Sequence, residues 1–216
     1  MTIGHFYRIL ITERKCGTLK STKASENKKL KRNRLYDAAF ELFSRKGVNE
    51  TVVDEIVKHA GIAKGTFYLY CKDKYDLVEK IILKRSAYVF ENAMKALAEQ
   101  NRKSPMDFTG RVIFFIDYLI EFFKQNSNLL SLIYKNLSWS LYEKAMNYEE
   151  IVEAKQIFLR HFSLSGSNAQ TAKRRLFIVV SMVGAVCYNS LVLKSPYLID
   201  DVKPELYRCV KKILAG

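Results

Sequence analysis

The sequence is poor in the residues that interrupt helices, with only 3 prolines and 9 glycines among 216 residues. Disordered and loop-rich proteins are rich in such residues, so this composition argues against both classes. Hydrophobic residues make up 49% of the chain and aromatic residues 12%, which is enough to form a core. We therefore expect a folded, all-α protein, of a length that allows a small domain joined to a larger one.

Patterns typical of metal sites and catalytic sites are also lacking. The four cysteines are far apart and include no CxxC pair, so neither a zinc site nor a disulfide framework is indicated. The three histidines have no neighbours in the sequence that would form a metal site or a nucleophile–base pair. We expect a reduced, intracellular protein with no metal, no cofactor and no enzymatic activity.

Membrane association is not favoured by the sequence. The most apolar window, residues 177–193, has 17 residues and includes Asn189 and two serines, whereas a membrane span needs roughly 20 apolar residues. The opening apolar run contains Arg8, which is unlike a signal peptide. These features predict a buried helix at 177–193 in a cytoplasmic protein without a membrane partner.

Positive charge is concentrated near the N-terminus. The formal net charge is +14, and residues 1–85 carry 19 basic and 10 acidic side chains. Such a surplus predicts an anionic partner such as nucleic acid. Residues 14–34 hold nine basic side chains and one acidic one. We interpret residues 1–27 as a flexible basic arm, either simply solvated or lying along phosphates or in a minor groove.

The segment after this arm has the pattern of three helices. Apolar residues recur at helical spacing from about Lys28, and Gly47 is a natural end of that helix. Thr51 is placed to cap a second helix that Gly61 ends. A third begins near Lys64 and ends close to residue 71. Two short helices joined by a turn that contains glycine predict a helix-turn-helix.

The second helix of this motif has a surface suited to DNA. The small residues Gly65 and Thr66 allow close approach to base edges, while Lys64 can reach a phosphate or a guanine. Tyr68 can offer its hydroxyl to a phosphate, and Phe67 is expected to face the core. The predicted outer surface also includes Leu69 and Tyr70. Double-stranded DNA is therefore the expected partner of residues 28–75.

Three stretches of this region resemble the DNA-binding domain of the TetR family of transcriptional regulators: AAFELFSRKG, TVVDEIVKHAGIAKGTFYLY and KDKYDL. The resemblance covers residues 30–82, about a quarter of the chain. It implies that Lys74 and Thr51 meet the phosphate backbone. It also implies that the following residues face the major groove or its phosphates: Lys64, Gly65, Thr66, Tyr68 and Tyr70. The sequence departs from the family pattern at Val52, Ala63 and Cys71, and we interpret Cys71 as a small core residue.

The rest of the chain, residues 76–216, is expected to form a helical body for ligand binding and dimerisation. Residues 73–100 contain neither Pro nor Gly and predict one long connecting helix. The segment 105–125 is apolar on nearly all sides except for a stripe with Asp117 and Glu121, which we expect to be solvated rather than to bind a cationic ligand. Further helices, which bring the total to about nine, are expected at 128–136, 139–162, 169–194 and 201–214.

The predicted body is rich in aromatic residues, each of which alone is more typical of a core than of a ligand site. The family resemblance implies an inducer cavity among the body helices, and apolar pockets are the general form of such sites. We therefore expect a small hydrophobic or aromatic effector. The candidate ligand-binding residues are Phe114, Phe115, Tyr118, Trp139 and Tyr142.

Three functions remain open at this level. The favoured one is a homodimeric repressor that a small apolar or aromatic ligand releases from a near-palindromic operator. For its dimer, the resemblance implies a four-helix interface built from 169–194 and 201–214. The alternative is a DNA-bound architectural or interaction protein of the same fold without an inducer. An enzyme on a helical scaffold is the third, and no set of residues in the sequence supports it.

Overall fold

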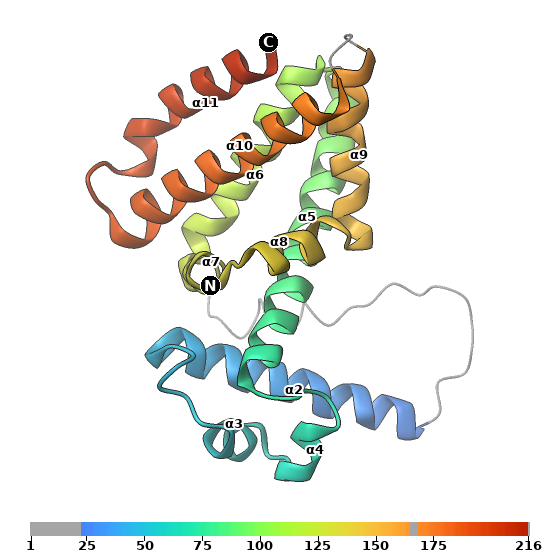
Figure 1. Ribbon diagram of the computed structural model, residues 1–216, viewed down its shortest axis with the longest axis vertical. Coiled ribbons are helices and arrows are strands. Elements are labelled where there is room, and N and C mark those ends of the chain that lie inside the picture. Colours follow the sequence, from blue (N-terminus) through green and yellow to red (C-terminus); the bar gives the residue numbers. More distant parts are fainter. Residues whose placement is uncertain (1–22, 165–167, 216) are drawn as a thin grey trace.

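The computed structural model describes residues 23–164 and 168–215, and within these ranges the chain forms ten α-helices and one short π-helix. No β-strand occurs in this described part of the chain, so the predicted all-α class is confirmed (Figure 1). In chain order the helices are α2 (Lys23–Lys46), α3 (Val53–Ala60), α4 (Lys64–Tyr68), α5 (Lys74–Lys103), α6 (Phe108–Gln125), α7 (Ser127–Asn136), α8 (Trp139–Met146), α9 (Glu149–Leu164), α10 (Ala169–Cys187), η1 (Tyr188–Leu193) and α11 (Ile199–Ala215).

The helix α2 begins earlier than the sequence predicts. It starts at Lys23 rather than near Lys28, so the last residues of the predicted arm 1–27 are helical. Residues 1–22 lie outside the described residues. The exposed first turns of α2, which carry Lys28 and Lys31, extend past α4 at the right of Figure 1.

The turn between α2 and α3 differs in its capping from the prediction. Gly47 ends α2 with a φ of +85°, a left-handed conformation that favours glycine. The N-cap of α3 is Val52 rather than Thr51, and the Glu55 carboxylate accepts the Val52 N–H at 3.2 Å. The Thr51 hydroxyl instead donates to the Gly47 carbonyl at 2.7 Å, so this side chain closes the turn and does not cap the helix.

The long helix α5 connects the two parts of the molecule. Asp73 caps it, because its carboxylate accepts the N–H groups of Tyr75 and Asp76, each at 2.8 Å. At about 1.5 Å per residue its 30 residues span roughly 45 Å. Figure 1 shows α5 rising from α2, α3 and α4 at the bottom into the helical body above.

Two clusters of buried residues lie along α5. The head cluster joins α2, α3, α4 and the first turns of α5, with Phe67 and Leu77 fully buried. It also includes Leu132 of α7 and Leu141 of α8, so two body helices are anchored in the core of the head. The body cluster joins α6, α7, α9, α10 and α11. Since α7 contributes Leu130 to the body cluster as well, it packs into both cores.

The segment 139–162 forms two helices, and the prediction of one helix is wrong. The helix α8 ends at Met146 and α9 begins at Glu149. Asn147 terminates α8, and its N–H still bonds to carbonyls of the last turn. No Gly or Pro marks this break, so the sequence pattern gave no sign of it.

The acidic stripe on α6 pairs with α11. Lys203 of α11 contacts Asp117 at 2.5 Å and Glu121 at 2.7 Å, and the Tyr207 hydroxyl donates to Asp117. Burial alone would raise the pKa of Asp117, but the hydrogen bonds from Lys203 and Tyr207 outweigh it and lower that pKa. This stripe therefore holds α11 against α6, and its carboxylates remain partly exposed to solvent as expected.

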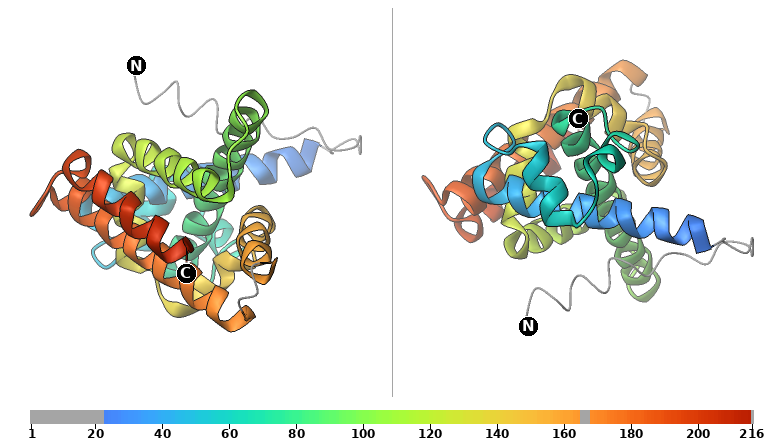
Figure 2. Two further views of the ribbon diagram at one scale, coloured as in Figure 1. Left: turned by 90° about the horizontal axis from the view of Figure 1, so that it is seen from above. Right: turned by 90° about the horizontal axis from the view of Figure 1, so that it is seen from below.

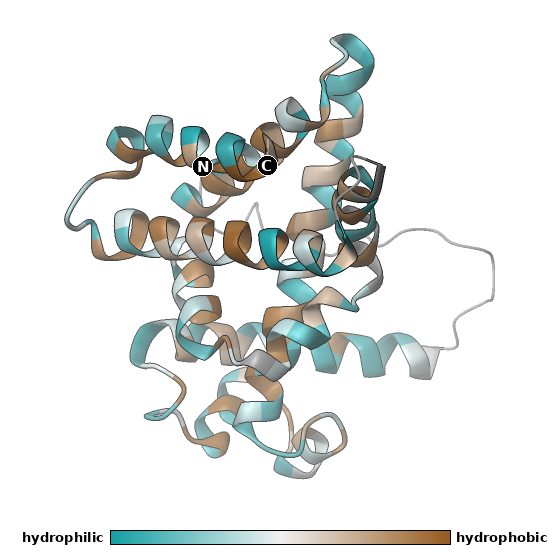
Figure 3. Cartoon of the chain, turned by 45° about the horizontal axis from the view of Figure 1, so that its top comes forward, coloured by the Kyte–Doolittle hydropathy of each residue, from teal (hydrophilic) through white to brown (hydrophobic). Residues whose placement is uncertain are grey.

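The helix pair α10 and η1 is much less buried than the sequence predicts. The segment Ala169–Leu193 is long and apolar enough to cross a membrane, and only 17% of its most apolar window is buried within the chain. Phe177 and Ile178 are 44% and 49% exposed. Figure 3 shows hydrophobic residues recurring along this part of the fold. The expected fully buried helix is therefore wrong, and α10 presents an apolar outer face.

Candidate DNA-binding surface and ligand cavity

The short helix α4 is held by a single inward residue. Phe67 is fully buried in the head cluster, and its ring meets the Tyr68 ring edge to face at 5.1 Å between centroids. With Phe67 fixed inward as predicted, the neighbouring side chains point outward. Tyr68 is 56% exposed and Leu69 is 76% exposed. The view from below in Figure 2 shows α3 and α4 at the surface of this end of the molecule.

The outer side of α4 and its C-cap carries five of the predicted DNA-facing positions, Tyr68 and Leu69 among them. Gly65 is exposed, and a Cβ placed there would have no neighbour within 4 Å, so the backbone is open to an approaching surface. Thr66 is partly exposed beside it. Lys64 forms an ion pair with Asp54 of α3 at 2.7 Å, which raises the lysine pKa. This exposed pair leaves Lys64 able to exchange its partner for a phosphate.

Thr51 does not belong to this surface. Its side chain is fully buried, its hydroxyl bonds to Gly47, and its N–H bonds to the Val48 carbonyl at 3.3 Å. The prediction that Thr51 contacts a phosphate is therefore corrected, because its side chain is buried inside the head.

Tyr70 and Lys74 have internal roles that the sequence did not reveal. The Tyr70 hydroxyl donates to the Lys28 carbonyl of α2 at 2.9 Å, which ties the end of the recognition segment to the first helix. Lys74 donates to the carbonyls of Asn49 and Thr51 at 2.6 and 3.0 Å. Both residues are partly exposed, so these bonds fix their tips rather than remove them from the surface.

Cys71 is buried in the head cluster, as predicted for a small core residue. Burial raises the pKa of its thiol to about 11, so it is protonated at neutral pH.

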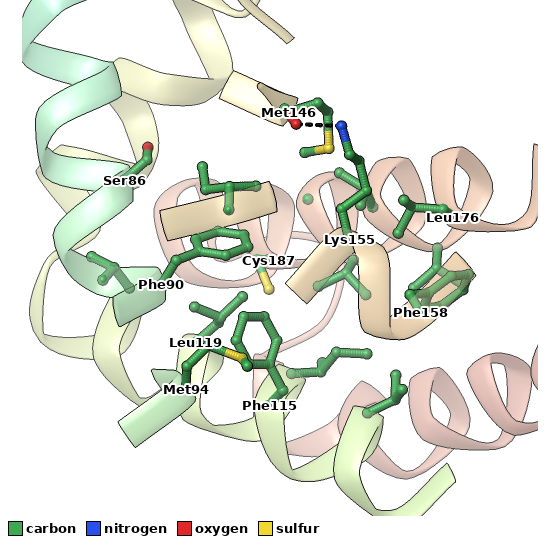
Figure 4. Close-up of a pocket in the computed structure, with 18 of the residues that line it drawn as sticks. Ser86, Phe90, Met94, Phe115, Leu119, Met146, Lys155, Phe158, Leu176 and Cys187 are labelled. Carbon is green, nitrogen blue, oxygen red and sulfur yellow. Dashed lines mark hydrogen bonds between the residues drawn. The ribbon is translucent and has the colours of Figure 1, made fainter. Parts of the chain in front are cut away.

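A cavity of about 320 Å³ lies in the body between α5, α6, α7, α9 and α10. This volume falls at the lower end of the range of small-molecule sites, roughly 300–1,000 Å³. In Figure 4, Phe90 of α5 and Phe115 of α6 point toward each other, and Met94, Leu119 and Cys187 surround them. The two phenyl rings meet edge to face at 5.2 Å.

Of the four predicted ligand-binding residues whose side chains the structure describes, the cavity includes only Phe115. Phe114 and Tyr118, four residues apart, share a different face of α6 and do not line the cavity. Tyr142 instead meets Phe177 edge to face at 6.0 Å. The side chain of Trp139 lies outside the described residues. Phe114 and Tyr118 are therefore corrected, because α6 is apolar on most sides and its sequence did not identify the inward face. Tyr142 of α8 is corrected because its ring packs against Phe177 and does not line the cavity.

Most residues that line the cavity were not among those predicted from the sequence. One wall is a face of α5, with Ser86, Phe90, Met94 and Leu97 at intervals of three and four residues. Another is the inner face of α10. Both faces show helical periodicity in the sequence, but the prediction followed aromatic content and so passed over the aliphatic residues.

Few polar side chains line the cavity. Lys155 of α9 donates to the Met146 carbonyl at 2.6 Å, the bond drawn in Figure 4. Ser86 of α5 also reaches the lining. Arg111, in the first turn of α6, is the third, and its Nε is buried without a hydrogen-bond partner. The thiol of Cys187 is buried too, which raises its pKa to about 12. The site can thus enclose an apolar molecule and offers it a few polar contacts.

Comparison with known proteins supports the assignment of the head. A family model described as bacterial regulatory proteins of the tetR family matches residues 35–81. The HTH-type transcriptional regulator AcrR of Shigella flexneri is 44% identical over 50 residues, which cover 23% of this chain and 23% of that protein. A fatty acid metabolism regulator protein of Bacillus subtilis is 31% identical over 75 residues, or 35% of this chain and 39% of that protein. These matches span less than half of either relative.

The fold of the whole chain also has close counterparts. A crystal structure of the transcriptional regulator FadR from Bacillus subtilis in complex with stearoyl-CoA superposes with a TM-score of 0.62 at 18% identity. The alignment covers 82% of this chain and 96% of that one. The relatives found are transcriptional regulators and not enzymes. The match at the helix-turn-helix and the agreement of the fold lead to one conclusion: residues 35–81 form a DNA-binding domain of the tetR type, in a chain that has the fold of TetR-family regulators.

Proposed function

We propose that this protein is a cytoplasmic, homodimeric repressor that leaves its operator when an apolar ligand fills the body cavity. The observation that carries the proposal is the continuity of α5. One end of this helix packs in the head beside α4, and its other half forms a wall of the cavity. A ligand that displaces this wall displaces the head as well.

DNA binding is the first part of the proposal. The exposed residues Lys64, Gly65 and Tyr68 of α4, with Leu69 at its C-cap, form a surface small enough to enter a major groove. A selection from random duplexes should yield a near-palindrome whose half-sites are separated by one helical turn or more. Its affinity should fall steeply with salt, with a slope near −0.9 per phosphate contact in log K against log salt. An affinity that does not change with salt contradicts this part.

Dimerisation is the second part, and the outer face of α10 supports it. Ile178 is half exposed, and the small residues Ser181 and Ala185 follow it on the same face, which allows close approach of a second helix. A second copy of the chain would cover this apolar face. The outer positions of α11 are largely charged, so α10 would supply most of the buried apolar area.

A charge on this face provides the test of assembly. Ile178→Glu should shift the full chain from dimer to monomer in sedimentation at micromolar concentration. Leu30→Glu is the matched control, because Leu30 is equally exposed but lies on α2. If both variants remain dimers, α10 is not the interface. Partition of the wild-type chain into lipid vesicles would instead assign the apolar face to a membrane.

Ligand control is the third part. The cavity lining is mostly aliphatic and phenylalanine side chains, and the Bacillus subtilis neighbour was crystallised with stearoyl-CoA. We infer that a single-chain apolar compound fits better than a polar one. Such a ligand should weaken operator binding by about 5- to 150-fold, the range of a coupling of roughly 1–3 kcal/mol. A protein that binds DNA tightly and never responds to such compounds would have the architectural function instead.

A further inference from the structure

Arg111 lines the cavity and carries a donor that nothing in the described chain accepts. Its Nε is buried and has no hydrogen-bond partner among the described residues. The residue as a whole is partly exposed, although its Nε is buried. None of the ion pairs found within the described ranges includes Arg111.

A buried charged donor without an acceptor is unfavourable. Leaving such a group unsatisfied costs about 1–3 kcal/mol, or more when it is charged. Buried unsatisfied groups are rare in native proteins and need an explanation such as a missing ion or ligand. Lys155, the other cation that lines the cavity, already has acceptors. Its ammonium bonds to the Met146 carbonyl at 2.6 Å and to Asn147 Oδ1 at 3.4 Å.

Arg111 lies in a part of α6 whose neighbouring side chains are apolar and aromatic. Phe108, one turn earlier on α6, packs its ring against Phe158 at 5.8 Å and Phe162 at 6.2 Å. The lining toward α5 is apolar, with Phe90 and Phe115 at its centre. The lining is therefore apolar apart from a few side chains, and Arg111 of α6 is the cation among them whose Nε has no partner.

We propose that the ligand is an amphipathic anion, with one hydrocarbon chain in the cavity and a carboxylate or phosphate-type group bound by Arg111. This inference rests on the proposed function, since it specifies the ligand of the same cavity. A guanidinium suits both acceptors, because its N–H groups form a planar fork that matches carboxylate and phosphate oxygens. The anion supplies the acceptor that Nε lacks, and the chain replaces empty space in the cavity.

Titration calorimetry on the full chain tests the inference with three probes that share a dodecyl chain. Dodecanoate and dodecanoyl-CoA carry an anion, and dodecanol does not. The wild type should bind at least one anionic probe about tenfold or more tightly than dodecanol. A preference for dodecanoate identifies a free carboxylate as the ligand, and a preference for the CoA thioester identifies its phosphates.

Two variants distinguish the contribution of the Arg111 charge to binding from that of the apolar lining. Arg111→Met should lose the preference for the anion and keep the affinity for dodecanol. Lys155→Met removes the other cation of the lining and should keep the preference. Thermal melting without ligand checks folding, and Arg111→Met should melt no lower than the wild type because a buried donor without a partner is removed.

The outcomes distinguish the two proposals. If dodecanol binds the wild type as tightly as both anions do, or if Arg111→Met keeps the preference, the role of Arg111 is refuted while apolar ligand binding stands. If no dodecyl compound binds, ligand control by apolar compounds fails, and the inference fails with it.

Discussion

The ring of Tyr134 stacks on the ring of Tyr188, with centroids 4.1 Å apart and planes 9° from parallel. Tyr134 belongs to α7, which packs into both cores and lines the cavity. Tyr188 begins the π-helix η1 at the end of α10, the helix that we propose as the dimer interface. One pair of rings thus joins a helix that lines the cavity to the end of the helix that we propose as the dimer interface.

The energy of this contact can be measured with a double-mutant cycle. Tyr134→Leu and Tyr188→Leu keep the apolar character and remove the stacking. Aromatic pairs contribute about 0.5–1.5 kcal/mol beyond burial, so the coupling energy between the two substitutions should be about 1 kcal/mol. Urea unfolding of the four proteins gives this value, and strictly additive effects would show that the stack has no energetic role.

Substitutions of Tyr68 and Lys74 should differ in their effects on DNA affinity and on stability. Tyr68→Ala removes an exposed side chain, so it should weaken DNA binding and leave the free energy of unfolding within about 0.5 kcal/mol of wild type. Lys74→Ala removes two charged hydrogen bonds that hold the turn before α3, and should lower stability by roughly 1–3 kcal/mol as well. Unfolding and DNA titrations on both variants make the comparison. Equal loss of stability in both would contradict it.

Gly65 offers a test of close approach between α4 and DNA. No atom lies within 4 Å of a Cβ at this position, and alanine is the better helix former by up to about 1 kcal/mol. Gly65→Ala should therefore unfold no more easily than wild type but bind the operator more weakly. Gly61→Ala is the contrasting control, because a φ of +62° strains alanine and should lower stability instead. Undiminished operator affinity in Gly65→Ala would place α4 farther from the bases.

Cys187 should make the protein sensitive to alkali. Burial raises its pKa from 9.0 to about 12, so the folded state keeps the thiol proton more strongly than the unfolded state. The stabilisation is fully present below pH 9 and is lost as pH rises toward 12. Across this range the unfolded state binds fewer protons, and the thiol contributes a slope of about −1.4 kcal/mol per pH unit.

Unfolding measured from pH 8 to 11 checks this slope. Cys187→Ala should show a shallower decline than wild type, while some decline should remain from Cys71 and from Tyr36, whose pKa values burial also raises. Cys209→Ala is the control, since this cysteine is exposed and should leave the slope unchanged. An unchanged slope in Cys187→Ala would mean that its thiol is not protected in the folded state.

The head could be predicted from the sequence because its signals are local. Gly47 and Gly61 mark helix ends, and Phe67 lies among polar neighbours on a short helix with one possible inner face. The roles of Tyr70 and Thr51 were less accessible. Tyr70 bonds to a carbonyl 42 residues away in the sequence. The Thr51 hydroxyl closes a turn, and the sequence around it is equally compatible with a threonine that caps a helix.

The cavity was less predictable for a different reason. A helix that is apolar on most sides, such as α6, does not reveal which face is inward until its neighbours are placed. Phe114 and Phe115 are adjacent and chemically identical, yet only Phe115 lines the cavity. The orphaned Nε of Arg111 is likewise a property of packing, because nothing in the sequence around residue 111 indicates a missing acceptor.

The central claim is that the cavity and the DNA-binding surface are energetically coupled, and the most direct measurement is the affinity for one ligand with and without operator DNA. Dodecanoate or dodecanoyl-CoA, whichever binds, is titrated into the free dimer and into the dimer saturated with its selected operator. Linkage requires the operator to weaken ligand binding by the same factor by which the ligand weakens operator binding, expected to be about 5- to 150-fold. Equal ligand affinity in both titrations would contradict the account, and the protein would then be a DNA-binding protein whose cavity does not control it.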